Sequence, residues 1–128
     1  MTDDLSDGIR VAILEQAADA IIFADHKGTI LLWNSAAERL FGFTAEQVLG
    51  QSLDVFIPER LRAPHWSGYH AAMERGRTRL EGRPTVTKAL HSSGDTVYVS
   101  MSFAVVTAPT RGVVGSVAIA RAAARPAR

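Results

Sequence analysis

The sequence predicts an α+β fold, with one five-stranded antiparallel sheet and short helices on one of its faces. Three observations predict this arrangement: two strand-like runs joined by a hairpin signal, a following stretch of helical spacing, and three further strand-like runs. Both groups of strands can join one antiparallel sheet, and the helices between them then cover one face of that sheet.

An amphipathic helix is expected over residues 5–16, ahead of the first strand. Leu5, Ile9, Ala12 and Ile13 recur near one stripe at helical spacing. An apolar stripe on a surface helix needs a partner, so the sequence predicts a homodimer that forms through the N-terminal helix.

The first two strands are expected at residues 20–24 and 29–33. Both runs are rich in β-branched or aromatic residues, and residues 25–28, which end in Gly28, supply the turn between them. These residues predict a β-hairpin at the start of the sheet.

A short helix is expected directly after this hairpin, over residues 35–40. The side chain of Asn34 can accept a hydrogen bond from a free backbone N–H of the first turn. Gly42 stands where the helix must end, because glycine adopts the left-handed conformation without a steric penalty.

A second short helix is expected after Thr44. Thr44 with Gln47 three residues later matches a capping box, and Gly50 is expected to end this helix. Short helices of this kind leave room for a pocket between themselves and the sheet.

A longer helix is expected over residues 59–75, with Pro58 at its N-terminus. Pro64 and Gly68 lie inside this range, and both residues predict a break in the helix or an irregular first turn.

Three more strands are expected at residues 85–91, 96–107 and 113–120. The residues that follow, 121–128, are rich in alanine and arginine and are expected to fray. The order of elements is therefore two strands, several helices and three strands.

Composition excludes several classes of protein. The 128 residues suit one domain, and the 47% hydrophobic and 21% charged residues are typical of a globular protein. The net charge of +1 provides no field for a nucleic-acid backbone, and no apolar run reaches the roughly 18 to 20 residues that span a bilayer. The chain has no cysteine, which excludes disulfides and flavin–cysteine adducts. We therefore expect a cytoplasmic protein that contacts neither nucleic acid nor membrane.

A resemblance to PAS domains begins in the run ADAIIFADHKGTILLWNSAAERLFGF at residues 18–43. It continues through TAEQVLGQSL, IPER and SSGDTVYVSMS and ends near residue 120. The resemblance implies a sheet that faces short helices across a cavity. It also divides the chain into a helical cap at 1–16, a stand-alone PAS sensor at 17–121 and a frayed tail at 122–128. Ala122–Ala124 follow the sensor where many PAS domains carry Asp-Ile-Thr before a kinase helix, so signalling through an attached kinase is not indicated.

The long helix resembles that of the rhizobial oxygen-sensing haem PAS domains. His65 lies seven residues after Pro58, which is similar to the spacing of their iron-binding histidine. The resemblance implies that His65 is the proximal ligand to the iron of haem b, and a neutral imidazole is chemically suited to that role. Tyr69, one turn later, is expected on the same side of the helix.

The same resemblance implies residues for the opposite wall. The strand at 96–107 alternates, so that Val99, Met101 and Phe103 form an apolar face, which in the resembled domains crowds the gas-binding side. The arginine that contacts oxygen there corresponds to a position near Arg83, although Pro84 follows it and the spacing to the next hairpin is longer. Four arginines in this region suit haem propionates, a flavin phosphate or a solvated basic face: Arg75, Arg77, Arg79 and Arg83.

Three functions stay open on these residues. The first is a haem sensor for a diatomic gas or a redox state, the second a PAS module for flavin or a small metabolite, and the third a ligand-free dimerisation or adaptor domain. Each would act on a downstream signalling protein. An enzyme is not expected, because no nucleophile–base pair, metal cluster or phosphate loop occurs at a known spacing.

Overall fold

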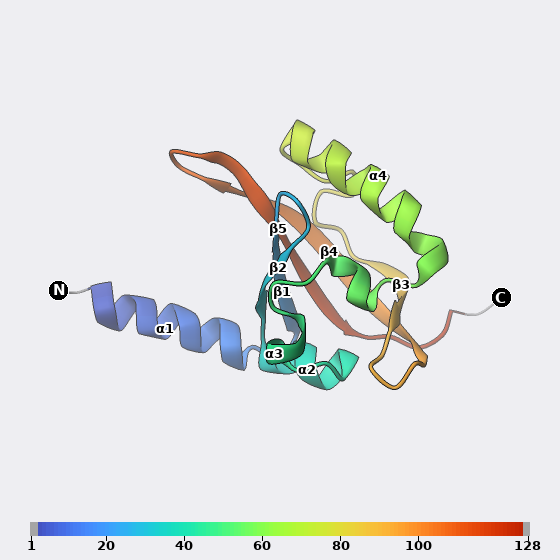
Figure 1. Ribbon diagram of the computed structural model, residues 1–128. Helices are drawn as coiled ribbons and strands as arrows, with labels where there is room; N and C mark the ends of the chain where they lie inside the picture. The colour runs from blue at the N-terminus through green and yellow to red at the C-terminus, as the bar shows by residue number, and fades with distance from the viewer. Residues whose placement is uncertain (1–2, 127–128) are drawn as a thin grey trace.

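The computed structural model describes residues 3–126 and contains one five-stranded antiparallel sheet with helices on one face (Figure 1). The strands lie in the order β2-β1-β5-β4-β3. Their bounds are β1 Ala20–Asp25, β2 Ile30–Trp33, β3 Thr85–Leu90, β4 Thr96–Ala108 and β5 Gly112–Ala122. The helices are α1 Asp3–Gln16, α2 Ser35–Phe41, α3 Ala45–Val48, the 3₁₀ turn η1 Leu53–Phe56, and α4 Glu59–Arg75. The predicted α+β fold is confirmed.

The core lies between the sheet and helices α2 to α4. Alternate residues of the central strands point into it, as Ile22 of β1 and Val99 of β4 do, and both are almost fully buried. Trp33, Phe41 and Phe56 form an aromatic cluster at one end, with ring centroids 4.9 to 5.6 Å apart. Such pairs add stability beyond the apolar area that they bury.

Helix α1 stands apart from this core and projects away from the sheet (Figure 1). Its last turn is attached to the body through Asn34, whose side-chain nitrogen donates to the carbonyl oxygens of Leu14 at 2.8 Å and Asp19 at 3.0 Å. The side-chain oxygen of Asn34 accepts from the backbone N–H groups of Ile21 at 2.9 Å and Ala37 at 3.0 Å. All four hydrogen-bonding positions of this buried amide are thus occupied.

The predicted caps of the short helices are confirmed, with one exception. Asn34 caps α2 and Gly42 ends it at a φ of 79°, and Thr44 and Gln47 form both bonds of the capping box. Gly50 does not end α3, because Leu49 does so in an extended conformation and donates its N–H to Ala45. Gly50, at a φ of 85°, instead forms the turn after the helix.

Helix α4 is continuous, so the predicted break at Pro64 or Gly68 is wrong. Proline removes one helical hydrogen bond, which would run from residue 64 to the carbonyl of Arg60. Pro64 and Arg60 are both exposed, so water can replace that bond at the carbonyl of Arg60.

Strand β5 extends to Ala122, although the sequence favoured fraying from residue 121. Arg121 and Ala122 continue the ladder with Ser100 and Val99 of β4, and Ala123 donates its N–H to the carbonyl of Tyr98 at 2.9 Å. The division into a helical cap, a sensor and a tail stays a prediction, and its outermost residues, 1–2 and 127–128, lie outside the described part of the chain.

Candidate functional site

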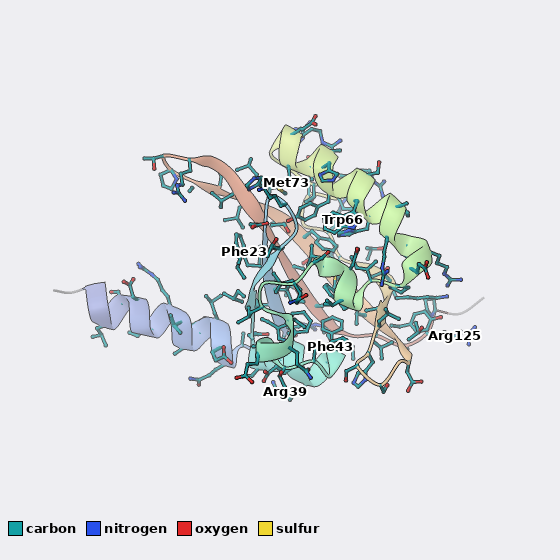
Figure 2. The ribbon with its side chains drawn as sticks, viewed as in Figure 1. Phe23, Arg39, Phe43, Trp66, Met73 and Arg125 are labelled. Carbon is teal, nitrogen blue, oxygen red and sulfur yellow. The ribbon has the colours of Figure 1, made fainter. Side chains whose placement is uncertain are left out.

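Helix α4 lies beside the sheet and positions His65 and Tyr69 on one face, one turn apart. Trp66 lies on the same helix (Figure 2). It fixes the helix there, because its indole Nε1 donates to the carboxylate of Asp54 in η1 at 2.8 Å. The ring of Trp66 also packs on Gly28 in the β1–β2 turn, where any Cβ atom would clash with the indole. The glycine is therefore required by this close approach as well as by its positive φ of 86°.

An inner cavity of about 270 Å³ lies between α4, η1 and the sheet. Its wall is mostly apolar, and the histidine in its lining is His65. Met101 and Phe103 of β4 stand on the sheet side of the cavity, as the sequence alternation predicts for their strand. Val99, from the same face of β4, is fully buried in the core and does not line the cavity wall.

His65 contains the unsatisfied polar atom of this site. Its Nδ1 is buried and has no hydrogen-bond partner within the described residues. A buried polar atom without a partner costs roughly 1 to 3 kcal/mol, so it needs a structural or functional explanation. Burial lowers the pKa of His65 below its ordinary value of 6.5, the charge of Asp54 opposes that shift, and His70 adds to it. The imidazole is therefore held neutral, which is the form that binds a metal.

The lowered pKa predicts how stability depends on pH. The unfolded chain takes up a proton on His65 more readily than the folded chain does, so this contribution to stability is complete above pH 6.5 and is lost as the pH falls below it. Lowering the pH from about 7.5 to about 5.5 should lower the melting temperature, and a His65→Leu variant should show a smaller decrease. An identical pH dependence of the two melting temperatures would contradict this account.

An outer cavity of about 430 Å³ adjoins the inner one. It lies between α4 and the loop that leads to β3, and the two cavities share His65, Phe103, Ser116 and Pro64 in their walls. Three of the four predicted arginines line it, namely Arg75, Arg79 and Arg83. Arg83 is exposed and its Nε donates to the carbonyl of Leu80 at 3.0 Å. The structure thus places a neutral imidazole and three arginines in the wall of the same outer cavity.

Tyr69 lies in the wall of the outer cavity, but its hydroxyl is engaged by the protein. The hydroxyl donates to the carbonyl of Asp25 at 2.6 Å and lies 3.3 Å from that of Ala24, both at the end of β1. It accepts from the hydroxyl of Ser116 in β5 at 3.2 Å. Burial raises the pKa of Tyr69, so the phenol stays protonated and joins α4 to the sheet. Its ring, and not its hydroxyl, is free to contact a ligand.

Comparison with known proteins identifies the family. The PAS fold matches residues 8–121. The chain belongs to the PAS family. This PAS domain is 29% identical over 106 residues to the oxygen sensor protein DosP of Escherichia coli, which covers 83% of this chain and 13% of DosP. It is 41% identical over 54 residues to the sensor protein FixL of Bradyrhizobium diazoefficiens, which covers 42% of this chain and 11% of FixL.

The fold of this PAS domain recurs in solved structures. A PAS domain from Colwellia psychrerythraea superimposes with a TM-score of 0.78 at 23% identity, over 92% of this chain and 97% of that one. The likeness concerns the fold alone. The chain spans about an eighth of the length of the two curated relatives, so their activities as whole proteins are not transferred by the match.

Sequence reasoning missed two residues of this PAS domain's site. Ser116 lines both cavities and bonds to Tyr69, and the alternation of β5 could have found it, because Ser116 shares its face with Ala118 and Ala120. Asp54 sets the position of Trp66 and acts on the pKa of His65, but a single aspartate in a short helical turn carries no signal of either contact.

Proposed function

We propose that this PAS domain is a sensor that binds haem b through His65 and responds to a diatomic gas or to a change of redox state. The observation that carries the proposal is the buried, unpaired Nδ1 of a neutral imidazole at the junction of two cavities. The likeness to a protein named as an oxygen sensor supports it.

The residues present fit such a group. The inner cavity alone lies just below the roughly 300 to 1,000 Å³ of small-molecule sites, and the two adjoining cavities together lie within that range. His65 would ligate the iron, and Leu61, Phe56 and Met101 would contact the apolar macrocycle. When bound, haem supplies an iron centre that takes up a diatomic gas or an electron. Arg75, Arg79 and Arg83 offer charge for its propionates at the outer rim.

Met101 and Phe103 give the domain a way to respond. They stand on β4 across the inner cavity from the helix that bears His65, so a ligand that crowds them presses on the sheet. Tyr69 joins the same helix to β1 and β5 through its hydroxyl. A ligand shifts the arrangement only as far as it prefers one state, and typical couplings are roughly 1 to 3 kcal/mol.

The visible absorption spectrum tests the proposal. The purified domain, mixed with haem and passed over a desalting column, should retain a band of histidine-ligated haem that shifts when carbon monoxide is added. The proposal would be rejected if the protein leaves the column without haem, or if its spectrum does not change when carbon monoxide is added.

A module for flavin or a small metabolite is the second candidate. The observation that favours it is the size of the inner cavity, which at 270 Å³ suits a ligand smaller than haem. A protein that purifies with flavin absorption bands and does not take up haem would place this candidate first. A ligand-free adaptor is the third reading, and the open cavity volume argues against it.

The homodimer through α1 belongs to the same proposal. Leu5, Ile9, Val11 and Ile13 are 52 to 73% exposed on α1, and Leu31 and Ile119 are exposed on the outer face of the sheet. Replacing Ile9 and Ile13 together with serine should turn a dimer into a monomer in light scattering at micromolar concentration. Arg10→Ser, which removes an exposed ion pair with Asp7 on the same helix, should leave the dimer intact. A parent protein that is itself monomeric would defeat the idea.

PAS domains are in general sensory modules, and we propose no catalytic activity for this one. No group of three or more metal-ligating side chains occurs within residues 3–126, and no helix in that range is long and apolar enough to cross a membrane. We propose that the domain acts in the cytoplasm on a downstream signalling protein. A chain without cysteine fits the reducing conditions of that compartment.

A further inference from the structure

We propose that the free edge of β3 is a docking site for an extended, acidic segment of a partner protein, which would add to the sheet as a sixth strand. This inference does not depend on haem. It rests on the difference between the two edges of the sheet and on the charges gathered at one of them.

The two edge strands of the sheet differ in whether their outer backbone groups are hydrogen-bonded. Strand β2 is covered, because Ile30 donates its N–H to Gln51 at 2.9 Å and its carbonyl accepts from Gly50 at 2.8 Å. A bridge between Thr29 and Ser52 extends this cover. Strand β3 pairs with β4 on one side, and within residues 3–126 its other side has no backbone partner. An uncovered edge is a template for another strand.

The register shows which groups point outward. His91 donates its N–H to Asp95 at the turn, so the hydrogen-bonded pairs of this antiparallel ladder alternate back from there through Ala89, Thr87 and Thr85. The intervening residues, Val86 and Lys88, therefore direct their backbone N–H and C=O groups away from β4, toward solvent. An added strand could bond to both of them, and to Leu90 beyond.

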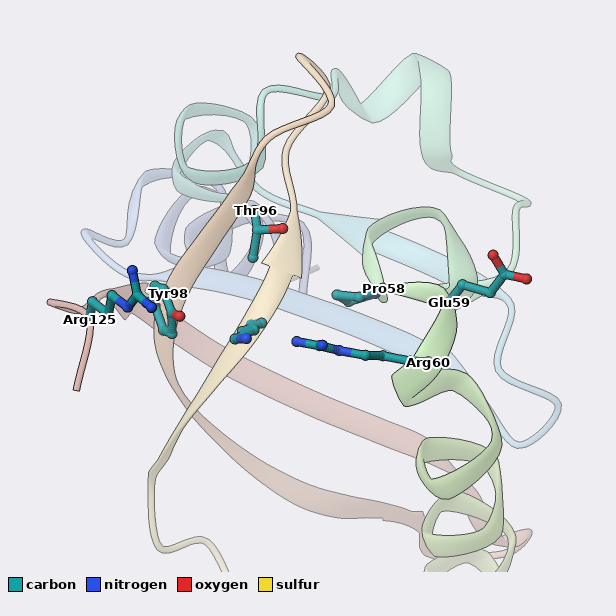
Figure 3. A pocket seen from close by; sticks show the side chains of 7 residues that line it. Pro58, Glu59, Arg60, Thr96, Tyr98 and Arg125 are labelled. Atoms are coloured by element: carbon teal, nitrogen blue, oxygen red, sulfur yellow. The ribbon is translucent and has the colours of Figure 1, made fainter. Parts of the chain in front are cut away.

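Three cations lie around β3 and come from three separate parts of the chain. Arg60 extends from the first turn of α4 toward β3, and Arg125 lies by Tyr98 on the other side of the strand (Figure 3). Lys88 stands on β3 itself, with its Nζ 5.8 Å from the centroid of the Tyr98 ring. None of the three forms an ion pair within residues 3–126, and together they line an open cleft of about 890 Å³.

Charge decides which strand this edge can accept. Glu59 is the one acidic side chain in the wall of the cleft, and the three cations outnumber it, so the cleft has a net positive charge. Two copies of β3 paired edge to edge would bring like charges together around Lys88, and opposed like charges destabilise a sheet. An acidic strand at the free edge would meet Arg60 and Lys88, and Arg125, by Tyr98 of β4, adds positive charge to the same cleft. The geometry therefore favours an acidic partner over a second copy of this chain.

Peptide binding tests the proposal. A fluorescein-labelled peptide of ten residues, in which glutamate alternates with threonine and valine, should bind in fluorescence anisotropy, and the same peptide with lysine for glutamate should bind at least about tenfold more weakly. Binding of the acidic peptide should slow hydrogen exchange at the amides of Val86, Lys88 and Leu90. Equal affinity for the two peptides, or protection at other amides only, would overturn the proposal.

Two pairs of variants separate the backbone from the charges. Val86→Pro removes an outward N–H and leaves the bonds to β4 in place. It should weaken the binding of the acidic peptide at least about tenfold, whereas Val86→Thr should not. Lys88→Glu should weaken binding more than Arg111→Glu, which makes the same change of net charge in the β4–β5 turn. Retained binding in both Val86→Pro and Lys88→Glu would show that the peptide does not add to this edge.

Discussion

Replacement of His65 by alanine should abolish stable haem binding, with a loss of at least about a hundredfold in affinity. The reason lies in the site: His65 is the imidazole in the wall shared by the two cavities, and its Nδ1 has no other partner within the described residues. Haem affinity can be measured from the absorption band as haem is titrated into each protein.

Two controls separate ligation from folding. His70→Ala changes an exposed imidazole on the same helix that stacks on Trp66 and lines neither cavity, so it should bind haem as the parent does. Free imidazole added to His65→Ala should partly restore the absorption band, because the small ligand can occupy the space that the side chain leaves. If His65→Ala and the parent retain haem equally, His65 is not the ligand.

Replacement of Asn34 by alanine should destabilise the fold by about 3 kcal/mol. The change removes four hydrogen bonds at once and leaves the N–H of Ala37 and the N–H of Ile21 without their acceptor. It also releases the carbonyls of Leu14 and Asp19, which hold the end of α1. Urea unfolding followed by tryptophan fluorescence measures the loss.

Two neighbouring changes test this account of Asn34. Ser35→Ala removes an exposed hydrogen bond to Glu15 and should lower the free energy of unfolding by no more than about 0.5 kcal/mol. Asn34→Asp keeps both acceptor roles but faces two carbonyl oxygens with a carboxylate, so hydrogen exchange should rise in residues 14–19 more than in α2. A loss for Asn34→Ala no greater than that for Ser35→Ala would contradict the central role of the amide.

Local rules predicted much of the fold. The cap at Asn34, the left-handed end at Gly42 and the box of Thr44 and Gln47 each depend on residues within three or four positions. The same rules failed at Pro64, where they predicted a break. The helix continues there because other residues of α4, such as Tyr69 and Leu61, pack against the core, and this packing outweighs one lost bond.

The site was less accessible from sequence, because its contacts are distant along the chain. Resemblance placed His65 at a cavity, but the partners of the Tyr69 hydroxyl lie 44 to 47 residues away, and no local pattern indicates them. The outer cavity depends on how the loop after α4 folds back over the helix, so the position of Arg79 and Arg83 at its rim needed the structure. The end of β5 likewise depends on its pairing with β4.

The attachment of α1 at its last turn makes the helix a lever. Its 14 residues span roughly 21 Å, and its fixed end is the one held by Asn34. A tilt of about 10° at that end would therefore displace the far end by roughly 4 Å, about the distance of one side-chain contact. A shift of about 0.4 Å in α2 or β1, acting at the helix radius of about 2.3 Å, would produce such a tilt and would thus be enlarged about tenfold at the far end, where Leu5 and Ile9 are exposed. A rearrangement too small to change the core could still decide which surfaces meet.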